Sequence, residues 1–97
     1  MKKIIAKNKK HLEKLIQEEM EKNGPNCDLN HIDVTKITDM SWLFCDSQFN
    51  GYISEWDVSK VNCMYCMFYN SKFNQDISKW NVGMVIYMHG IFNSMGF

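Results

Sequence analysis

The chain has 97 residues, of which 45% are hydrophobic, and its eleven basic residues balance eleven acidic ones, so that the formal net charge is zero. This length predicts a single domain. A net charge of zero argues against a nucleic-acid partner, and no apolar run approaches the roughly 20 residues that span a membrane. The lack of a recognisable signal peptide predicts a cytoplasmic protein, or a surface protein if the chain is a fragment.

Residues 1–24 are predicted to form an N-terminal capping helix. Over residues 2–22 the apolar side chains recur at helical steps and share one face. They are Leu12, Leu15, Ile16 and Met20. Gly24 suits the left-handed residue after a helix end, and Pro25 cannot continue the helix. Five of the first ten residues are lysines, which predicts a solvated helix start; the alternative is an arm for an anionic partner.

Residues 27–97 repeat themselves three times with a period of 24, as units 27–50, 51–74 and 75–97. Each apolar position of the first unit is refilled by an apolar residue in the next two. This self-similarity is the signature of a repeat protein whose units bury their apolar sides by stacking. The expected stacks are Ile32-Trp56-Trp80, Val34-Val58-Val82, Phe44-Phe68-Phe92 and Phe49-Phe73-Phe97.

Each unit is predicted to contain a short strand and a short helix. The strand half alternates polar and apolar residues, as at residues 31–34, and the other half spaces its apolar residues as a helix does. In the first unit these are Met40, Leu43 and Phe44. Thr38 and Asn62 are suitable N-caps. The predicted fold class is α/β, a short solenoid of three strand–helix repeats with parallel strands, capped by the N-terminal helix.

The residues of the second and third units are more specific than their spacing. Phe49-Asn50 leads into Ile53-Ser54-Glu55-Trp56-Asp57-Val58, and Phe73-Asn74 leads into Ile77-Ser78-Lys79-Trp80-Asn81-Val82. Over positions 27–97, the chain resembles the BspA-type leucine-rich repeat of bacterial surface and mobile-element proteins. The resemblance implies a right-handed, leucine-rich-repeat-like solenoid used for protein binding or adhesion. It implies no enzymatic activity and no catalytic residues to transfer to this chain.

No residues have the spacing of a catalytic or metal site. Cys63 and Cys66 form an isolated C-x-x-C pair, whereas structural zinc sites usually use two such pairs. Plain thiols are favoured over zinc ligation or a redox-responsive pair, because the other units fill the cysteine positions with different residues. The histidines lie in separate elements, at His11, His31 and His89. We therefore expect no enzyme, no metal and no cofactor.

The outward side of the predicted strands is the first candidate surface for partner binding. It would be the concave face with which repeat proteins usually contact their partners. It would present His31, Asp33, Glu55, Asp57, Lys79 and Asn81. The alternatives are a cation site in the column of Asp33 and Asp57 or, more simply, a solvated strand face.

The third unit is the second candidate surface, because several polar positions turn apolar there. Met84 stands where the other units have lysine, Ile86 where they have Thr or Asn, and Met95 where they have serine. An uncovered end with apolar side chains and an unpaired strand edge favours pairing with another chain. We expect self-association through Met84, Ile86, Met95 and Phe97, most simply as a twofold homodimer. The alternative is a ragged end without a partner.

The predicted function is non-catalytic protein–protein interaction, by a module that self-associates and binds an unidentified protein. One alternative is a fragment or short member of a bacterial surface adhesion protein. Another is a small inhibitor, encoded by a mobile element, that acts by binding another protein.

Overall fold

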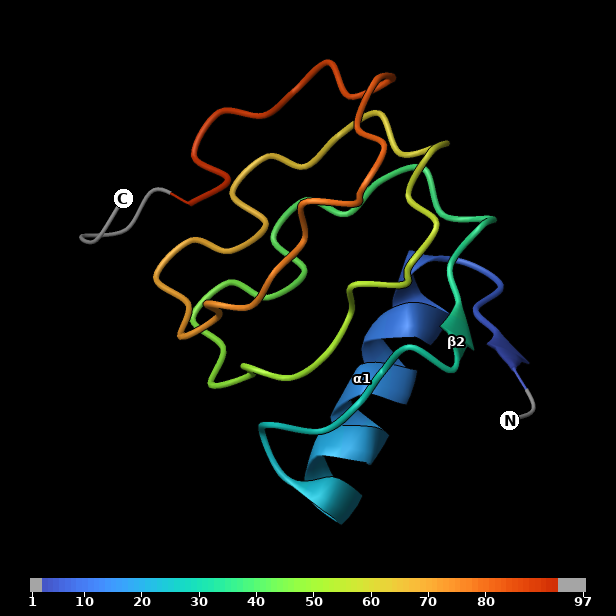
Figure 1. The fold of residues 1–97 in the computed structure, drawn as a ribbon, viewed down its shortest axis with the longest axis vertical. Helices are drawn as coiled ribbons and strands as arrows, with labels where there is room; N and C mark the ends of the chain where they lie inside the picture. Colours follow the sequence, from blue (N-terminus) through green and yellow to red (C-terminus); the bar gives the residue numbers. More distant parts are fainter. Residues whose placement is uncertain (1–2, 93–97) are drawn as a thin grey trace.

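The computed structural model describes residues 3–92, which contain one helix and two short strands (Figure 1). Strand β1 (Ile4–Ile5) precedes helix α1 (Lys9–Asn23), and strand β2 (Ile32–Asp33) follows it. The strands pair in parallel, with Ile4 opposite Ile32 and Ile5 opposite Asp33. From residue 34 on, the described chain consists of turns, irregular stretches and isolated parallel bridges, which wind back and forth on one side of α1.

Helix α1 has the amphipathic pattern that the sequence predicts. Leu12 and Ile16 are buried in the core, and Leu15 and Met20 pack against it. At 15 residues, many of them charged, α1 is too short and too polar to span a membrane, and residues 3–92 contain no other helix.

The prediction of one helix from residue 2 is wrong at its start. The Asn8 side-chain oxygen accepts a hydrogen bond from the His11 N–H at 2.8 Å, which caps α1 at that point. The preceding residues are extended, because the Ile4 N–H bonds to the carbonyl of His31 at 2.9 Å and so joins β1 to β2. At the other end, Gly24 terminates the helix at φ +86°, in the left-handed region that favours glycine.

Three later stretches, called here the turn segments, follow the same path: residues 39–46, 63–70 and 87–92. Left-handed backbone recurs along them, with φ between +52° and +72°, at Trp42, Asp46, Cys66, Asn70 and Gly90. A residue in this conformation cannot continue a right-handed helix. Each turn segment is therefore a succession of tight turns.

Alternate N–H groups of the first two turn segments bond to the next segment, and several of those between them bond to the carbonyl three residues back, not four. Those of Met40 and Trp42 bond to the carbonyls of Cys63 and Tyr65, at 2.8 and 3.0 Å. The same pattern recurs one sequence period later, where N–H groups of the second turn segment bond to carbonyls of the third. An α-helix would need the same N–H groups for its own carbonyls. The ladder between segments therefore replaces the hydrogen bonds of the predicted helices.

The predicted fold class, an α/β right-handed solenoid of three strand–helix repeats with an N-terminal cap, is therefore wrong. Within residues 3–92, no helix follows Thr38 or Asn62, and residues 55–58 and 79–82 form no strand. A helix of two turns is only marginally stable alone, so neighbouring carbonyls can capture its N–H groups. The structure is a small α/β globule built from α1, the β1–β2 pair and the turn segments.

Stacked aromatic rings form the core beneath the turns. Phe44 stacks on Phe68 with ring centroids 5.6 Å apart, and Trp56 stacks on Trp80 at 6.5 Å. The partners in each pair are one sequence period apart, so residues at equivalent positions of successive units contact each other. The core extends from Leu12 in α1 to Trp80 without a break. Burying one such side chain stabilises a fold by roughly 1.5–3 kcal/mol.

Candidate interaction surfaces

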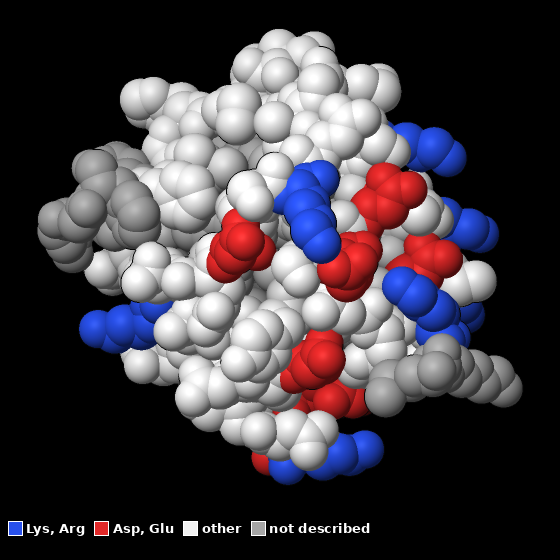
Figure 2. Space-filling model, viewed as in Figure 1, with Lys and Arg blue, Asp and Glu red and all other residues white. Residues whose placement is uncertain are grey.

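Charged side chains of both signs share the face of the molecule seen in Figure 2, where acidic residues gather near the centre with lysines between and beside them. Among the residues predicted to bind a partner, Glu55 and Lys79 come together, with Lys79 Nζ 4.0 Å from Glu55 Oε2. Both side chains are more than half exposed. An exposed pair of this kind contributes at most about 1 kcal/mol, so it shapes the charge of the surface more than its stability.

Asp33, Asp57 and Asn81 each hold a turn. Their Oδ1 atoms accept the N–H two residues ahead at 2.9, 3.0 and 3.0 Å respectively. The hydroxyl and the N–H of Thr35 both donate to Asp33 and lower the pKa of its carboxyl, and Ser59 does the same for Asp57. One oxygen of each side chain is therefore engaged in shaping its own loop.

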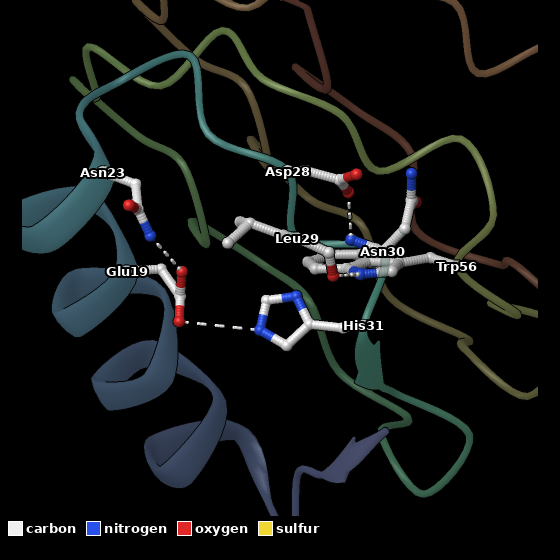
Figure 3. A network of polar contacts seen from close by, with 7 residues as sticks. All are labelled: Glu19, Asn23, Asp28, Leu29, Asn30, His31 and Trp56. Carbon is white, nitrogen blue, oxygen red and sulfur yellow. Dashed lines mark hydrogen bonds and ion pairs between the residues drawn. The ribbon is translucent and has the colours of Figure 1, made fainter. Parts of the chain in front are cut away.

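The His31 side chain points from the turn before β2 towards Glu19 on α1 (Figure 3). Its Nε2 is 3.6 Å from Glu19 Oε2, and the other Glu19 oxygen accepts a hydrogen bond from Asn23 at 2.9 Å. Beside them, the Trp56 indole N–H donates to the carbonyl of Leu29 at 2.9 Å. The His31 side chain is only 14% exposed. It joins the helix to the core and is a poor candidate for contact with a partner.

A shallow pocket lies beside Lys79. It measures about 190 Å³ and is lined by Tyr52, Ile53, Ser54, Gln75, Asp76 and Lys79. Small-molecule sites usually measure roughly 300–1,000 Å³, so this pocket is small for a substrate. Within the described part of the chain, no three His, Cys, Asp or Glu residues are grouped to hold a metal ion.

The four cysteines are free thiols. Burial raises the pKa of the Cys27 thiol, and burial together with the nearby carboxylate of Asp46 raises that of Cys45. The thiolate is the reactive form of cysteine. Neither of these two side chains therefore has the low pKa of an activated nucleophile.

The end of the molecule formed by residues 84–88 exposes apolar side chains. Met84 is 59% exposed and Ile86 is 72% exposed, and Tyr87 and Met88 beside them are also exposed. Met95 and Phe97, which were assigned to the same surface, lie outside the described residues. We call the exposed set Met84, Ile86, Tyr87 and Met88 the apolar end.

The backbone at the apolar end also offers hydrogen-bond donors. The N–H groups of Met64 and Cys66 bond to the carbonyls of Tyr87 and His89, at 2.8 and 3.1 Å. The equivalent N–H groups of the third turn segment belong to Met88 and Gly90, and they have no acceptor among residues 3–92. Within residues 3–92 this edge of the ladder is therefore open. It presents these donors and also the carbonyl of Ile86, which is equivalent to the Thr38 and Asn62 carbonyls that accept an N–H from the next unit.

A further exposed surface, which the sequence did not predict, carries aromatic rings from the first two turn segments. Trp42 is 48% exposed, and Tyr65 and Tyr69 are each 38% exposed. Their ring centroids lie 5.5 and 6.2 Å from that of Trp42. These residues occupy positions where the other units have small or polar residues, such as Ser41, Cys45 and Cys66. That departure from the repeat was the signal available in the sequence.

Comparison with known proteins identifies the family. A family model described as "Mycoplasma protein of unknown function, DUF285" matches residues 10–96, which is most of the chain. The match supports a bacterial origin for this type of repetitive sequence. No curated protein and no solved structure matches the chain.

Proposed function

The chain belongs to the DUF285 family, and from that premise we propose that it is a non-catalytic protein-interaction module that self-associates through its apolar end. The resemblance to BspA-type repeats, which bind proteins, supports the same class of function. The observation that carries the proposal is the coincidence of exposed apolar side chains with open backbone donors, at Met84, Ile86, Met88 and Gly90.

The side chains supply the attraction in this proposal. In a twofold dimer the same patch faces itself, so Met84 and Ile86 meet their own copies. The N–H groups of Met88 and Gly90 are left to water or to the rim of the contact. Burying Met84 and Ile86 against a second copy contributes roughly 1.5–3 kcal/mol for each side chain.

Sedimentation or light scattering over 1–500 µM tests the proposal. Wild type is expected to shift from monomer to dimer within this range, and the double variant Met84→Lys/Ile86→Thr is expected to raise the dimer Kd by roughly 100-fold or more. The matched control is Ile5→Lys, because Ile5 is also an exposed isoleucine but lies in β1. A wild type that stays monomeric throughout, or a control that dissociates as readily as the double variant, contradicts the proposal.

A further inference from the structure

Trp42, Tyr65 and Tyr69 form a corner of aromatic rings on the surface. The indole of Trp42 meets Tyr65 at an interplanar angle of 73° and Tyr69 at 69°. The two tyrosines therefore stand nearly perpendicular to the indole. The faces of aromatic rings carry negative charge density. We call this arrangement the aromatic corner.

The core does not explain the aromatic corner. The rings of the core, such as Phe44 and Phe68, stack nearly parallel, at 1° to each other, and are buried. The rings of the corner meet edge to face and remain exposed. In addition, Tyr65 stacks on His89 with centroids 5.7 Å apart, which holds the base of the corner against the third turn segment.

Two acidic residues and one lysine from α1 lie near Trp42. Asp39 and Asp46 flank Trp42 in the first turn segment, and residues 39–46 contain no basic residue. Asp39 already has a cation, since Lys9 Nζ lies 3.6 Å from its Oδ2. Asp46 has a neutral partner, the Asn70 amide, and its own N–H bonds to the carbonyl of Tyr69 at 2.9 Å. Within residues 3–92 the Asp46 carboxylate therefore has no cationic partner, and its contact with Asn70 places it next to Tyr69 in the second turn segment.

We propose that the aromatic corner binds an arginine side chain of a partner protein. A guanidinium is flat, so it can stack on the indole face while its N–H groups reach the carboxylate of Asp46. A lysine ammonium can use the charge but not the stacking. The site shares no residue with the apolar end, and the proposal does not depend on whether this chain self-associates.

Titration with the peptide acetyl-Gly-Arg-Gly-amide, followed by the indole N–H signals in a proton–nitrogen NMR spectrum, tests the proposal. Trp56 and Trp80 are buried and their indole N–H groups bond to carbonyls, so their signals report on the fold. The Trp42 signal is expected to shift and to saturate at millimolar peptide. The matched peptide with citrulline, which lacks the charge, is expected to bind about 10-fold more weakly.

Three variants locate the binding. Trp42→Asn removes the ring and suits the left-handed backbone of φ 61°, and with it the backbone signals of Tyr65 and Tyr69 are expected to stop responding. Asp46→Asn is expected to weaken binding about 3- to 10-fold. Tyr52→Ala removes an exposed tyrosine that lines the separate pocket beside Lys79, and it is expected to bind as wild type does.

Several results would overturn the arginine site. Among the peptides, these are equal binding of the arginine and citrulline peptides, a lysine peptide that binds as tightly as the arginine peptide, and a proline-rich peptide that binds more tightly. The absence of any saturable shift would also overturn it. So would a loss of binding with Tyr52→Ala as large as that with Trp42→Asn. The titration is repeated on Met84→Lys/Ile86→Thr, so that failure of the corner and failure of self-association are read separately.

Discussion

At Gly51 two neighbouring stretches of backbone come into direct contact. A Cβ atom added there would lie 1.8 Å from the carbonyl oxygen of Cys27 and 2.7 Å from a ring carbon of Phe49. The N–H of Tyr52, the next residue, bonds to the same Cys27 carbonyl at 3.1 Å. Glycine is therefore required here because of the space available, and any larger residue must push the two stretches apart.

Gly51→Ala is expected to reduce the free energy of unfolding by about 3 kcal/mol or more, because the obstacle is backbone and cannot rotate away. Urea unfolding followed by circular dichroism measures the loss. Gly83→Ala is the matched control, since its nearest contact would be a side-chain oxygen at 3.1 Å, and it is expected to change stability by less than about 1 kcal/mol. Equal losses in the two variants would show that the Gly51 contact is not tight.

Helix α1 is the one described element whose type and end could be predicted from its own residues. Its apolar spacing, its stop at Gly24 and its buried Leu12 and Ile16 all agree with the sequence pattern. Its start depends on two different influences. Asn8 supplies the local cap, and β1 holds the preceding residues in an extended form through β2. The second influence comes from a distant part of the chain, beyond the end of α1, so helical periodicity could not reveal it.

Asn8→Ala is expected to lower the free energy of unfolding by about 1 kcal/mol, since the N–H of His11 loses its acceptor. For a chain of this length that corresponds to a fall in melting temperature of about 4–8 °C, measurable by differential scanning calorimetry. Asn8→Asp keeps an acceptor at the helix start and should restore the wild-type value. An alanine variant that melts at the wild-type temperature would rule out a stabilising cap.

The turn segments show why the other elements were predicted wrongly. Met40, Leu43 and Phe44 have helical spacing, and Met40 and Phe44 are indeed buried. The same residues can be buried by a chain of tight turns. Trp42 adopts the left-handed conformation even though it is not a glycine, and no sequence rule predicts that for tryptophan. The hydrogen bonds from Met40 and Trp42 to the next segment determine the backbone path.

Across the whole molecule, carboxylates recur in turns along the chain, at Asp33, Asp57 and Asp76. Hydrogen bonds from Thr35 to Asp33 and from Ser59 to Asp57 lower the pKa of each carboxyl. The N–H and hydroxyl of Ser78 do the same to the pKa of Asp76. A carboxyl whose pKa is lower in the folded protein stabilises it above the pKa of the unfolded chain, about 3.9, and loses that contribution as the pH falls through the folded value.

We expect the melting temperature to fall as the pH is lowered from about 5 towards 2, because these carboxylates take up protons more readily when unfolded. The double variant Asp33→Asn/Asp57→Asn should show a shallower fall. Asparagine can make the same turn without titrating, as Asn81 does with the N–H of Gly83. Melting curves at half-unit pH steps provide the comparison. Parallel profiles for wild type and the double variant would contradict this account.

The candidate surfaces could be predicted only in part. The exposed positions of Met84 and Ile86 follow from comparing the units with one another, because each replaces a polar residue. The role of Asp33 and Asp57 in their own turns does not follow from strand alternation, which treats an outward carboxylate as free. The aromatic corner unites Trp42 with Tyr65 and Tyr69 across two segments, so it depends on how those segments lie side by side.

By itself, the sequence determined the apolar face of α1, the end of that helix and the pairing of rings at equivalent positions of successive units, such as Trp56 with Trp80. These features follow from which side chains avoid water. The spacing of hydrophobic residues in the sequence shows directly which side chains those are. Only the tertiary structure decided the backbone between those rings. Each N–H there can bond either within its own segment or to the next one, and the two choices bury the same apolar residues. The carbonyls of the neighbouring segment settle that choice, and with it the position of every exposed side chain on the turn segments.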